Sequence, residues 1–388
     1  MFSRLGLAAL IFISHHPEEV NVNGFAISAK TKNRSNKKQT GGFGKQVDAN
    51  ANVNVDASVP FQHTKDASES TTNLLNFLTS QKAEGLNAGC EIGISDITNM
   101  RGMFATTSFK KGEIICKIPS DCVLALSNPE LGGADAPTDV HTGRNFLKMY
   151  QNDPTASKTW APYLNTLPTK DERFDATPDF FTTEELDALE FPRSIRMAKE
   201  RLKGISELSA EDGVDFEELQ FATWLVASRK FQISIGLPPQ AQADGEAASS
   251  NPKPIQQLQV LIPYLDLINH ASDDFNAEIH LIDPEKDEAW FSIRATRPIK
   301  SGKEITICYG SGMGTSVELL HNYGFIAAEN RVDSFMLKKG VDDDECIDSV
   351  DGWSTTLAED EEALKASDLS DAMRKVLEFR CKLKKSYA

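Results

Sequence analysis

The sequence predicts an α+β fold in which two groups of short strands pair across a helical insertion. Strand-like segments occur before residue 120 and again after residue 255, while residues from about 140 to 235 show the apolar period of helices. Either strand group alone would leave half-made sheet edges, so we expect the two groups to pair with each other. The 388 residues, 40% of them hydrophobic and 25% charged, suit a globular chain of about two domains.

The composition argues against several classes of protein. Lys and Arg number 41 against 57 Asp and Glu, which gives a net charge of −16. Phosphate backbones repel such a chain, so we expect no nucleic-acid partner. The 6 cysteines form no CxxC pair and no Cys/His cluster with zinc spacing, so neither a metal site nor a disulfide scaffold is expected.

Residues 1–67 are interpreted as a leader outside the fold. Arg4 precedes the apolar run 5–13, which is too short to span a bilayer but suits a signal-peptide core. From Phe25 to Lys45 the chain is rich in Lys and hydroxyl residues and has no acid, as in organelle transit segments. This pattern predicts a plastid protein without stable membrane insertion. The alternative is a disordered tail on a cytoplasmic protein.

The first strand group occupies residues 68–135. A short amphipathic helix is capped by Ser70–Asn73 and ended by Gly85 and Gly89. Strands are predicted at 91–94, 103–105 and 113–118, with a turn at Lys111-Gly112 and a stop at Pro119.

The helical insertion covers residues 136–235. Thr182–Glu185 is a capping box for a helix over 184–190 that Pro192 stops. Asp215 opens a second helix, which is apolar on most sides and is therefore predicted to be buried. Residues 236–254 follow as an exposed, mobile loop, because twelve of these nineteen residues are Gly, Pro, Ala or Ser.

The second strand group covers residues 255–335, with strands at 260–262, 278–282, 289–295 and 304–309 and a hairpin turn at 283–287. Residues 336–388 combine an acidic linker with a C-terminal helix whose basic end suits its own dipole. We interpret the charges of that helix as a solvated face, with a partner-binding element as the alternative.

Chemistry is carried by a few local patterns, since no common hydrolase or nucleotide-binding motif is present. They are Arg101-Gly102-Met103-Phe104-Ala105, Leu261-Ile262-Pro263-Tyr264-Leu265-Asp266-Leu267-Ile268-Asn269-His270, Glu304-Ile305-Thr306-Ile307-Cys308-Tyr309-Gly310 and Tyr323-Gly324-Phe325. Trp160-Ala161-Pro162-Tyr163-Leu164 and Ser228-Arg229-Lys230-Phe231 lie between the first and second of these. In this order, over about residues 72–335, the patterns resemble the SET-domain protein methyltransferases. The resemblance is greatest to the branch typified by the Rubisco large-subunit lysine methyltransferase.

The resemblance implies a SET β-fold of small sheets, in which the Asn269-His270 and Tyr323 segments cross in a knot-like arrangement. It also implies S-adenosylmethionine (SAM) as the methyl donor. The residues that would bind SAM are Asn99, Arg101, Gly102 and Met103 at its methionine part, Asn269 at its amino-acid end, the His270 backbone at its adenine edge, and Tyr323. A glycine beside a polar run also lets the backbone approach a ligand closely.

By the same resemblance, Tyr309 is the catalytic tyrosine. A phenol can donate or accept a hydrogen bond without carrying charge at neutral pH. Tyr323 and Phe325 would line the channel for a lysine stem, because aromatic walls suit methylenes and attract an ammonium. A plain aromatic core cluster is the alternative.

Arg229 and Asp266 are carried over as contacts on the side of the substrate lysine. The alternative is a structural ion pair that closes the insertion onto the sheet. Glu304 is interpreted as structural. No dedicated base for the lysine stands out, so a water chain is the hypothesis for its deprotonation.

The function implied is that of a SAM-dependent protein-lysine N-methyltransferase whose partner is a protein presenting a lysine side chain. A non-histone substrate is expected, because the post-SET cysteine cluster of many histone methyltransferases is absent. Two alternatives stay open: a protein-histidine N-methyltransferase of the same branch, and a non-catalytic SET-like module that binds a peptide or SAM. The substrate-binding region after Phe325 is expected to be reduced.

Overall fold

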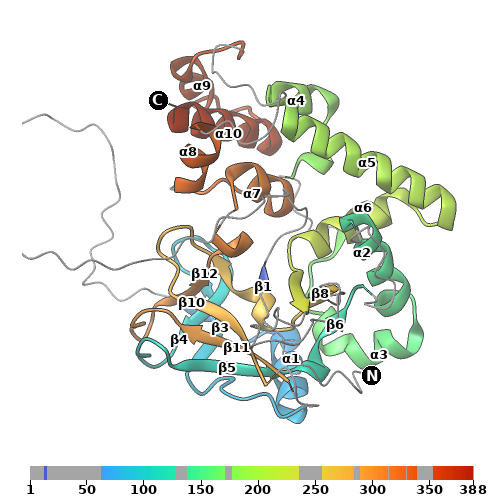
Figure 1. Cartoon of the computed structure of the whole chain (residues 1–388), viewed down its shortest axis with the longest axis vertical. Helices are drawn as coiled ribbons and strands as arrows, with labels where there is room; N and C mark the ends of the chain where they lie inside the picture. The colour runs from blue at the N-terminus through green and yellow to red at the C-terminus, as the bar shows by residue number, and fades with distance from the viewer. Residues whose placement is uncertain are drawn as a thin grey trace, which may run out of the picture.

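The two strand groups pair across the helical insertion, as the sequence predicts. The computed structural model describes residues 13–14, 63–127, 138–170, 177–235, 256–283, 289–312, 314–328, 330–338 and 353–387. Within these residues three small sheets lie together, and the helices pack beside and above them in the view of Figure 1. The α+β class with a helical insertion is therefore confirmed.

Each sheet joins a strand from before the insertion to one from after it. The strands are β1 Ile13–Ser14, β2 His63–Lys65, β3 Cys90–Ser95, β4 Arg101–Ala105, β5 Ile114–Pro119, β6 Leu124–Ala125, β7 Phe231–Ile235, β8 Gln256–Leu261, β9 Asn269–His270, β10 Ala277–Ile282, β11 Trp290–Ala295 and β12 Glu304–Ile307. Their orders are β2-β3-β4-β12-β9, β10-β11-β5 and β1-β7-β8-β6. The joins across the insertion are β4 with β12, β5 with β11 and β6 with β8, all antiparallel.

The second strand group differs from its prediction in two places. The strand predicted at 260–262 is longer, because β8 begins at Gln256 to pair with β7. The strand predicted over 304–309 ends at Ile307, and a 3₁₀ turn over Tyr309–Gly312 follows. Gly310 permits this turn with a φ of +68°. Tyr309 therefore lies in a turn at the end of β12, where its side chain can face neighbouring segments. The hairpin of β10 and β11 is confirmed, although residues 284–288 of its turn lie outside the described residues.

Helix α1, Glu69–Ser80, begins and ends earlier than predicted. Its cap is Ser68, whose side chain accepts the Thr71 N–H, and not the run that begins at Ser70. Gly85 lies beyond the helix end, with a φ of +81°. A Cβ there would lie 2.4 Å from the Ile115 carbonyl oxygen. This glycine is therefore needed where the chain crosses β5 closely.

The insertion consists of helices that pack on one another and on α7. They are α2 Asp139–Phe146, α3 Pro154–Leu164, α4 Thr183–Ala188, α5 Pro192–Asp212 and α6 Phe216–Ala227, with short turns η3 Leu147–Gln151 and η5 Pro178–Phe180. The capping box at Thr182 and Glu185 and the Asp215 cap are both present. From Leu219 onward almost every side chain of α6 is buried, as its apolar surface predicts. Pro192 was expected to stop a helix, yet it begins α5, where a missing N–H costs nothing.

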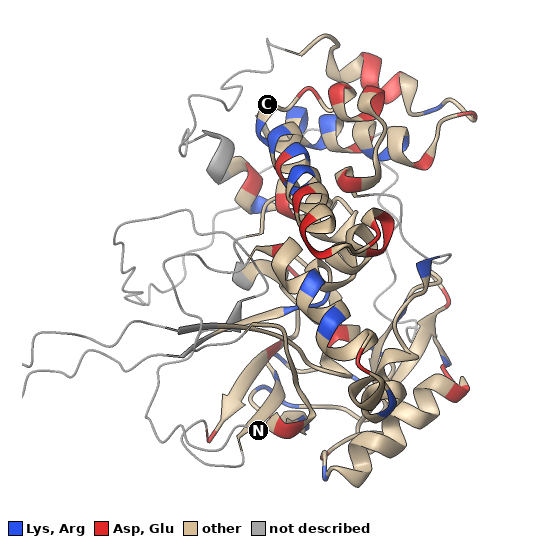
Figure 2. Cartoon of the chain, turned by 90° about the vertical axis from the view of Figure 1, so that its right-hand side faces the viewer, with Lys and Arg blue, Asp and Glu red and all other residues tan. Residues whose placement is uncertain are grey.

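The C-terminal helices belong to the fold. They are α7 Ser316–Tyr323, α8 Arg331–Lys338, α9 Leu357–Ala363 and α10 Asp371–Tyr387. Helix α10 packs against α4, α7, α8 and α9 (Figure 1). The interpretation of the α10 charges as a solvated face is wrong for two residues. Arg380 and Lys384 are each only 5% exposed and both pair with Asp360 of α9. Acidic and basic residues accordingly alternate through this region in Figure 2.

Part of the expected leader has a place in the fold. Ile13–Ser14 pairs with β7, and His63–Lys65 pairs with β3, so the boundary at residue 67 is corrected at these strands. Residues 1–12 and 15–62 of the expected leader, the loop 236–254 and the acidic segment 339–352 lie outside the described residues. The plastid address stays a prediction. None of the described helices has the length and apolar character that a bilayer-spanning helix needs.

Candidate active site

Three strands of the five-stranded sheet meet at a polar corner. Asn269 of β9 donates from Nδ2 to the Arg101 carbonyl oxygen of β4 at 3.0 Å and to Glu304 Oε1 of β12 at 2.7 Å. A Cβ on Gly102 would lie 2.5 Å from Glu304 Oε1 and 2.7 Å from Asn269 Nδ2. The corner therefore needs glycine at this position, and it brings together residues that are about 170 and 200 positions apart in sequence.

Tyr309 lies directly beyond this corner. Its hydroxyl donates to the Ile268 carbonyl oxygen at 2.7 Å, and its backbone N–H donates to His270 Nδ1 at 2.9 Å. Burial raises the pKa of the Tyr309 phenol above its usual value, so this group is neutral at working pH. A phenol oxygen that donates its proton in this way still has the chemical capacity to accept a hydrogen bond. Tyr309 and the Asn269-His270 pair are thus in direct contact.

Aromatic rings from two other segments pack around the Tyr309 ring. The ring centroid of Tyr323, the last residue of α7, lies 4.5 Å from that of Tyr309, and that of Phe325 lies 6.4 Å from it. His270 is 5.1 Å from Tyr309 and 5.5 Å from Phe325. Gly324 reverses the chain between the two aromatic residues with a φ of +73°. The segments of Asn269-His270 and Tyr323 therefore meet over Tyr309, as the knot-like arrangement implies.

Arg229 and Asp266 face the same buried region but do not form a direct ion pair. Asp266 Oδ2 accepts the Tyr163 hydroxyl at 2.7 Å, whereas the Arg229 guanidinium donates to Ser228 Oγ and lies 5.9 Å from the Trp224 ring. Burial raises the pKa of Asp266, and the charge of Arg229 opposes that shift. The alternative of a structural ion pair is therefore not found, and the hydrogen bond from Tyr163 of α3 closes the insertion onto the site instead.

The turn that carries Asp266 and Ile268 contains a strained residue. Tyr264 has a φ of +77°, which is unusual for a bulky side chain, and it directly precedes the 3₁₀ turn η6, Leu265–Leu267. Its fully buried hydroxyl lies 3.4 Å from the sulfur of Cys90 on β3. This buried contact holds the turn against the sheet, and it fixes the direction in which Ile268 presents its carbonyl to Tyr309.

A family model for the SET domain matches residues 100–310, which is more than half of the chain. The chain belongs to the SET-domain family. Two curated relatives have the same domain. SET domain-containing protein 4 of Homo sapiens is 26% identical over 250 residues, and Protein SET DOMAIN GROUP 40 of Arabidopsis thaliana is 23% identical over 291 residues. These matches cover 59% and 64% of this chain, and the chain spans about half the length of each relative, 53% and 55%.

Solved structures of SET domains share the fold. The SET domain of LSMT bound to lysine and AdoHcy superposes with a TM-score of 0.55 at 13% identity, covering 82% of this chain and 89% of that one. Rubisco LSMT bound to AdoMet gives a TM-score of 0.54 at 12% identity over the same shares. The similarity to the Rubisco methyltransferase branch, expected from the motifs, is therefore confirmed at the level of the fold.

Two residues expected to bind the cofactor do not reach the polar corner with their side chains, and their role at the cofactor stays a prediction. Asn99 lies in the exposed turn before β4 with a φ of +53°, and no described contact joins its side chain to the polar corner. The Met103 side chain is fully buried in the core, so only its backbone faces the corner. Arg101 contributes twice, since its carbonyl binds Asn269 and its guanidinium donates to the Thr166 carbonyl oxygen at 2.8 Å.

Sequence reasoning missed three groups of the site. Glu304, which the sequence places among structural residues, accepts the Asn269 amide at the corner. The Tyr163 hydroxyl donates to Asp266, and the Ile268 carbonyl accepts the Tyr309 hydroxyl. Tyr163 lies inside one of the motifs described from the sequence, and this position is the only indication in the sequence that it belongs to the site. A backbone carbonyl such as that of Ile268 leaves no signal in a sequence.

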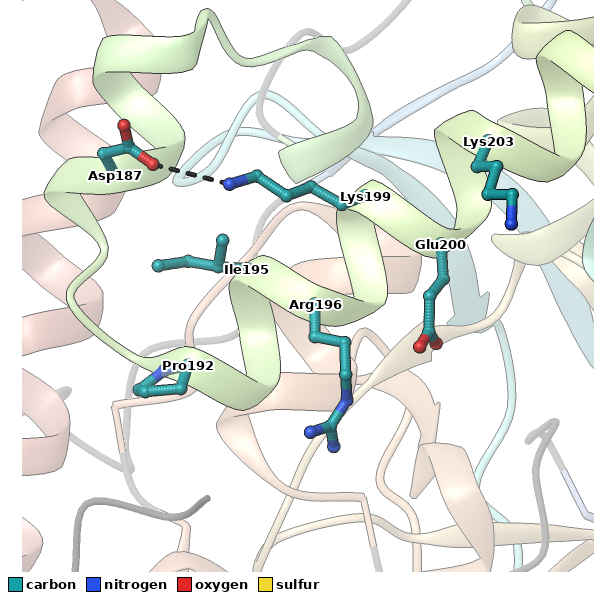
Figure 3. Close-up of a pocket in the computed structure, with 7 residues that line it drawn as sticks. All are labelled: Asp187, Pro192, Ile195, Arg196, Lys199, Glu200 and Lys203. Atoms are coloured by element: carbon teal, nitrogen blue, oxygen red, sulfur yellow. Dashed lines mark ion pairs between the residues drawn. The ribbon is translucent and has the colours of Figure 1, made fainter.

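A surface hollow of about 540 Å³ lies along α5 and shares no residue with the SET site. Figure 3 shows Asp187 and Lys199 facing each other beside it, 3.7 Å apart. Arg196, Glu200 and Lys203 continue along the same helix. Charges of both signs line this open hollow.

The buried His270 ring predicts a loss of stability in acid. Burial lowers its pKa from 6.5 to about 4, so between these values the unfolded chain binds a proton that the folded chain does not. Stability should therefore fall as the pH drops from 7 to 4, by about 3 kcal/mol from this group alone. The measurement is the free energy of urea unfolding at several pH values. His270→Asn keeps an acceptor for the Tyr309 N–H without titrating, so its pH dependence should be flatter. Parallel profiles for the two proteins would contradict the assignment.

Proposed function

We propose that this chain is a SAM-dependent protein-lysine N-methyltransferase that acts on a non-histone protein. One observation carries the proposal: the neutral Tyr309 hydroxyl, held on the Ile268 carbonyl, lies between the Asn269-His270 corner and a set of aromatic rings. Solved SET domains of the same fold are bound to AdoMet, to lysine with AdoHcy, and to sinefungin with monomethyllysine.

The polar corner fits the charge of SAM. Glu304 is half-buried and forms no salt bridge with another described residue, and burial raises its pKa. Asn269 Oδ1 accepts no hydrogen bond from the described residues. A buried carboxylate and a carbonyl oxygen without protein donors favour a cationic ligand. SAM carries an ammonium and a sulfonium, so Asn269 and Glu304 would hold its amino-acid end while Gly102 lets the strand approach it.

The residues of the site can orient an amine for in-line methyl transfer. SAM supplies an electrophilic methyl group on its sulfonium. The Tyr309 oxygen can accept a hydrogen bond from the attacking amine and hold its lone pair in line with that methyl. Tyr323 and Phe325 would surround the lysine methylenes, which desolvates the amine and excludes competing water.

Desolvation and the nearby guanidinium groups favour a neutral amine, whereas the carboxyl groups of Asp266 and Glu304 act in the opposite direction. The guanidinium groups of Arg101 and Arg229 both act on Asp266 and Tyr163 across this region. Positive charges near an ammonium lower its pKa and so favour release of its proton. A chain of water molecules would then carry the proton to solvent, as the sequence suggests in the absence of a dedicated base.

A labelling experiment tests the proposal. The full-length protein is incubated with SAM that carries an isotopic methyl group and with a lysate depleted of histones, and labelled peptides are located by mass spectrometry. We expect label on lysine, with Tyr309→Phe protein as the background. Label on histidine would replace lysine as the acceptor. Measurable SAM binding without label in any lysate would support the non-catalytic module and overturn the proposal.

A further inference from the structure

One buried guanidinium joins the helical insertion to the end of α7. Arg201 of α5 donates from Nη1 to Asp179 Oδ2 at 2.9 Å and to the His321 carbonyl oxygen at 3.1 Å. From Nη2 it donates to Asp139 Oδ2 and to Asn322 Oδ1, both at 2.8 Å. These partners belong to η5, α2 and α7, and all four are buried. The proposed methyl transfer does not involve the residues of this cluster directly.

The cluster connects to the site in two places. Asn322 directly precedes Tyr323, the ring that packs 4.5 Å from Tyr309. On its other side, Asp139 pairs with the buried ammonium of Lys230, the residue after Arg229, and Lys230 also binds Gln259 Oε1 at 3.1 Å. Asp139 is therefore linked to the neighbour of Tyr323 through Arg201, and to the neighbour of Arg229 through Lys230.

Both ends of α7 are fixed, but by different parts of the protein. At its start, the Asp333 carboxylate accepts the Ser316 N–H at 2.7 Å and the Ser316 hydroxyl at 2.6 Å. At its end, Arg201 binds a carbonyl and a side chain of the last turn, where a cation also suits the helix dipole. Gly324 then reverses the chain, so the last turn sets where the Tyr323 ring lies.

We propose that Arg201, acting through Asn322, is a positioning residue that holds the Tyr323 ring over Tyr309. The proposal deepens and rests on the proposed function, because Tyr323 would form the wall of the lysine channel. A guanidinium suits this task, since its planar fork reaches four acceptors at once and a network of charged hydrogen bonds in the interior is rigid. A residue that does not line the lysine channel thus sets the geometry of that channel.

The experiment removes the link without removing the charges. Asn322→Leu has nearly the same size and leaves Arg201 paired with Asp139 and Asp179. Asn322→Asp keeps the acceptor and should restore the link. Asn145→Leu is the matched control, because Asn145 of α2 donates to the Leu126 carbonyl oxygen at 2.8 Å and does not touch α7. Should Asn322→Leu fail to fold, Arg201→Lys serves in its place, since one ammonium cannot reach all four acceptors.

The first readout does not need activity. The protein is labelled with 3-fluorotyrosine, and the ¹⁹F resonance of Tyr323, one of 6 tyrosines, is assigned from the spectrum of Tyr323→Phe protein. We expect Asn322→Leu to shift or broaden this resonance, while Asn322→Asp and Asn145→Leu leave it as in the wild type. An unchanged resonance in Asn322→Leu would overturn the proposal, whatever the labelling experiment has shown about methyl transfer.

The second readout separates positioning from stability. If the protein transfers methyl groups, Asn322→Leu should lower kcat by about 10- to 100-fold, because a small misplacement at the reacting atoms has effects of this size. The KM for SAM should change little. The Asn145→Leu control should lower the melting temperature by a similar amount with kcat unchanged. Equal effects of the two variants on kcat would assign Asn322 a purely structural role and would overturn the proposal.

Discussion

Tyr309→Phe is expected to lower methyl transfer by about 10²- to 10³-fold, the size typical of one preorganised polar group at the reacting atoms. Binding of S-adenosylhomocysteine should be nearly unchanged, because the ring and its packing against Tyr323 remain. The Ile268 carbonyl loses its donor, which should reduce the free energy of unfolding by about 1–3 kcal/mol. The measurements are single-turnover transfer from labelled SAM, calorimetric binding and urea unfolding.

A matched variant separates catalysis from stability. Tyr150 has the same kind of bond, since its hydroxyl donates to the Ala125 carbonyl oxygen at 2.8 Å, but it lies in the insertion away from the site. Tyr150→Phe should therefore cost a similar amount of stability and leave the rate of transfer as in the wild type. Tyr309→Phe protein that transfers methyl groups at the wild-type rate would remove Tyr309 from the mechanism.

Gly102→Ala is expected to weaken the binding of SAM and of S-adenosylhomocysteine by about 100-fold, or about 2.8 kcal/mol. The added Cβ would lie 2.5 Å from Glu304 Oε1 and 2.7 Å from Asn269 Nδ2, so both side chains of the polar corner would have to move. The 2.7 Å bond between Asn269 and Glu304 would be disturbed as well. Isothermal titration calorimetry with S-adenosylhomocysteine measures the effect without turnover.

Gly204→Ala is the control for this substitution. Gly204 lies inside α5, and the nearest atom to an added Cβ is Val140 Cγ2 at 3.4 Å, an ordinary contact. Alanine is a better helix former than glycine, so this variant should be more stable by about 0.5–1 kcal/mol with unchanged binding. Wild-type affinity in Gly102→Ala protein would show that the cofactor does not approach this corner.

The pairing of the strands and the centre of the site could be predicted from the sequence because both leave local signals. Strands near residues 91–118 and 278–307 have apolar patterns bounded by glycine and proline, and unpaired edges require partners. Tyr309, Asn269 and His270 stand inside short motifs of definite order. Their contact follows from the parallel pairing of β9 with β12 inside the second strand group.

Other features could not be predicted, because they depend on residues brought together from separate helices. Arg201 has no motif around it, and its partners come from three other elements. Arg380 and Lys384 have the spacing of a solvated helix face, and they are buried because Asp360 of another helix neutralises them. The cap of α1 was mispredicted for a similar reason. Several hydroxyl residues stand near the start of α1, and the sequence does not show that Ser68 is the one that accepts the Thr71 N–H.

The pairing of early strands with late ones bears on how the chain folds after synthesis. Phe104 pairs with Glu304, which lies two hundred positions later in the sequence. The other two sheets also need strands from beyond residue 255. The ribosome releases the amino-terminal half first, and that half cannot complete any sheet by itself. Contacts this distant in sequence slow the search for the native state and leave strand edges exposed to aggregation meanwhile. The insertion helices contact one another locally, so we expect them to form before the site around Tyr309 assembles.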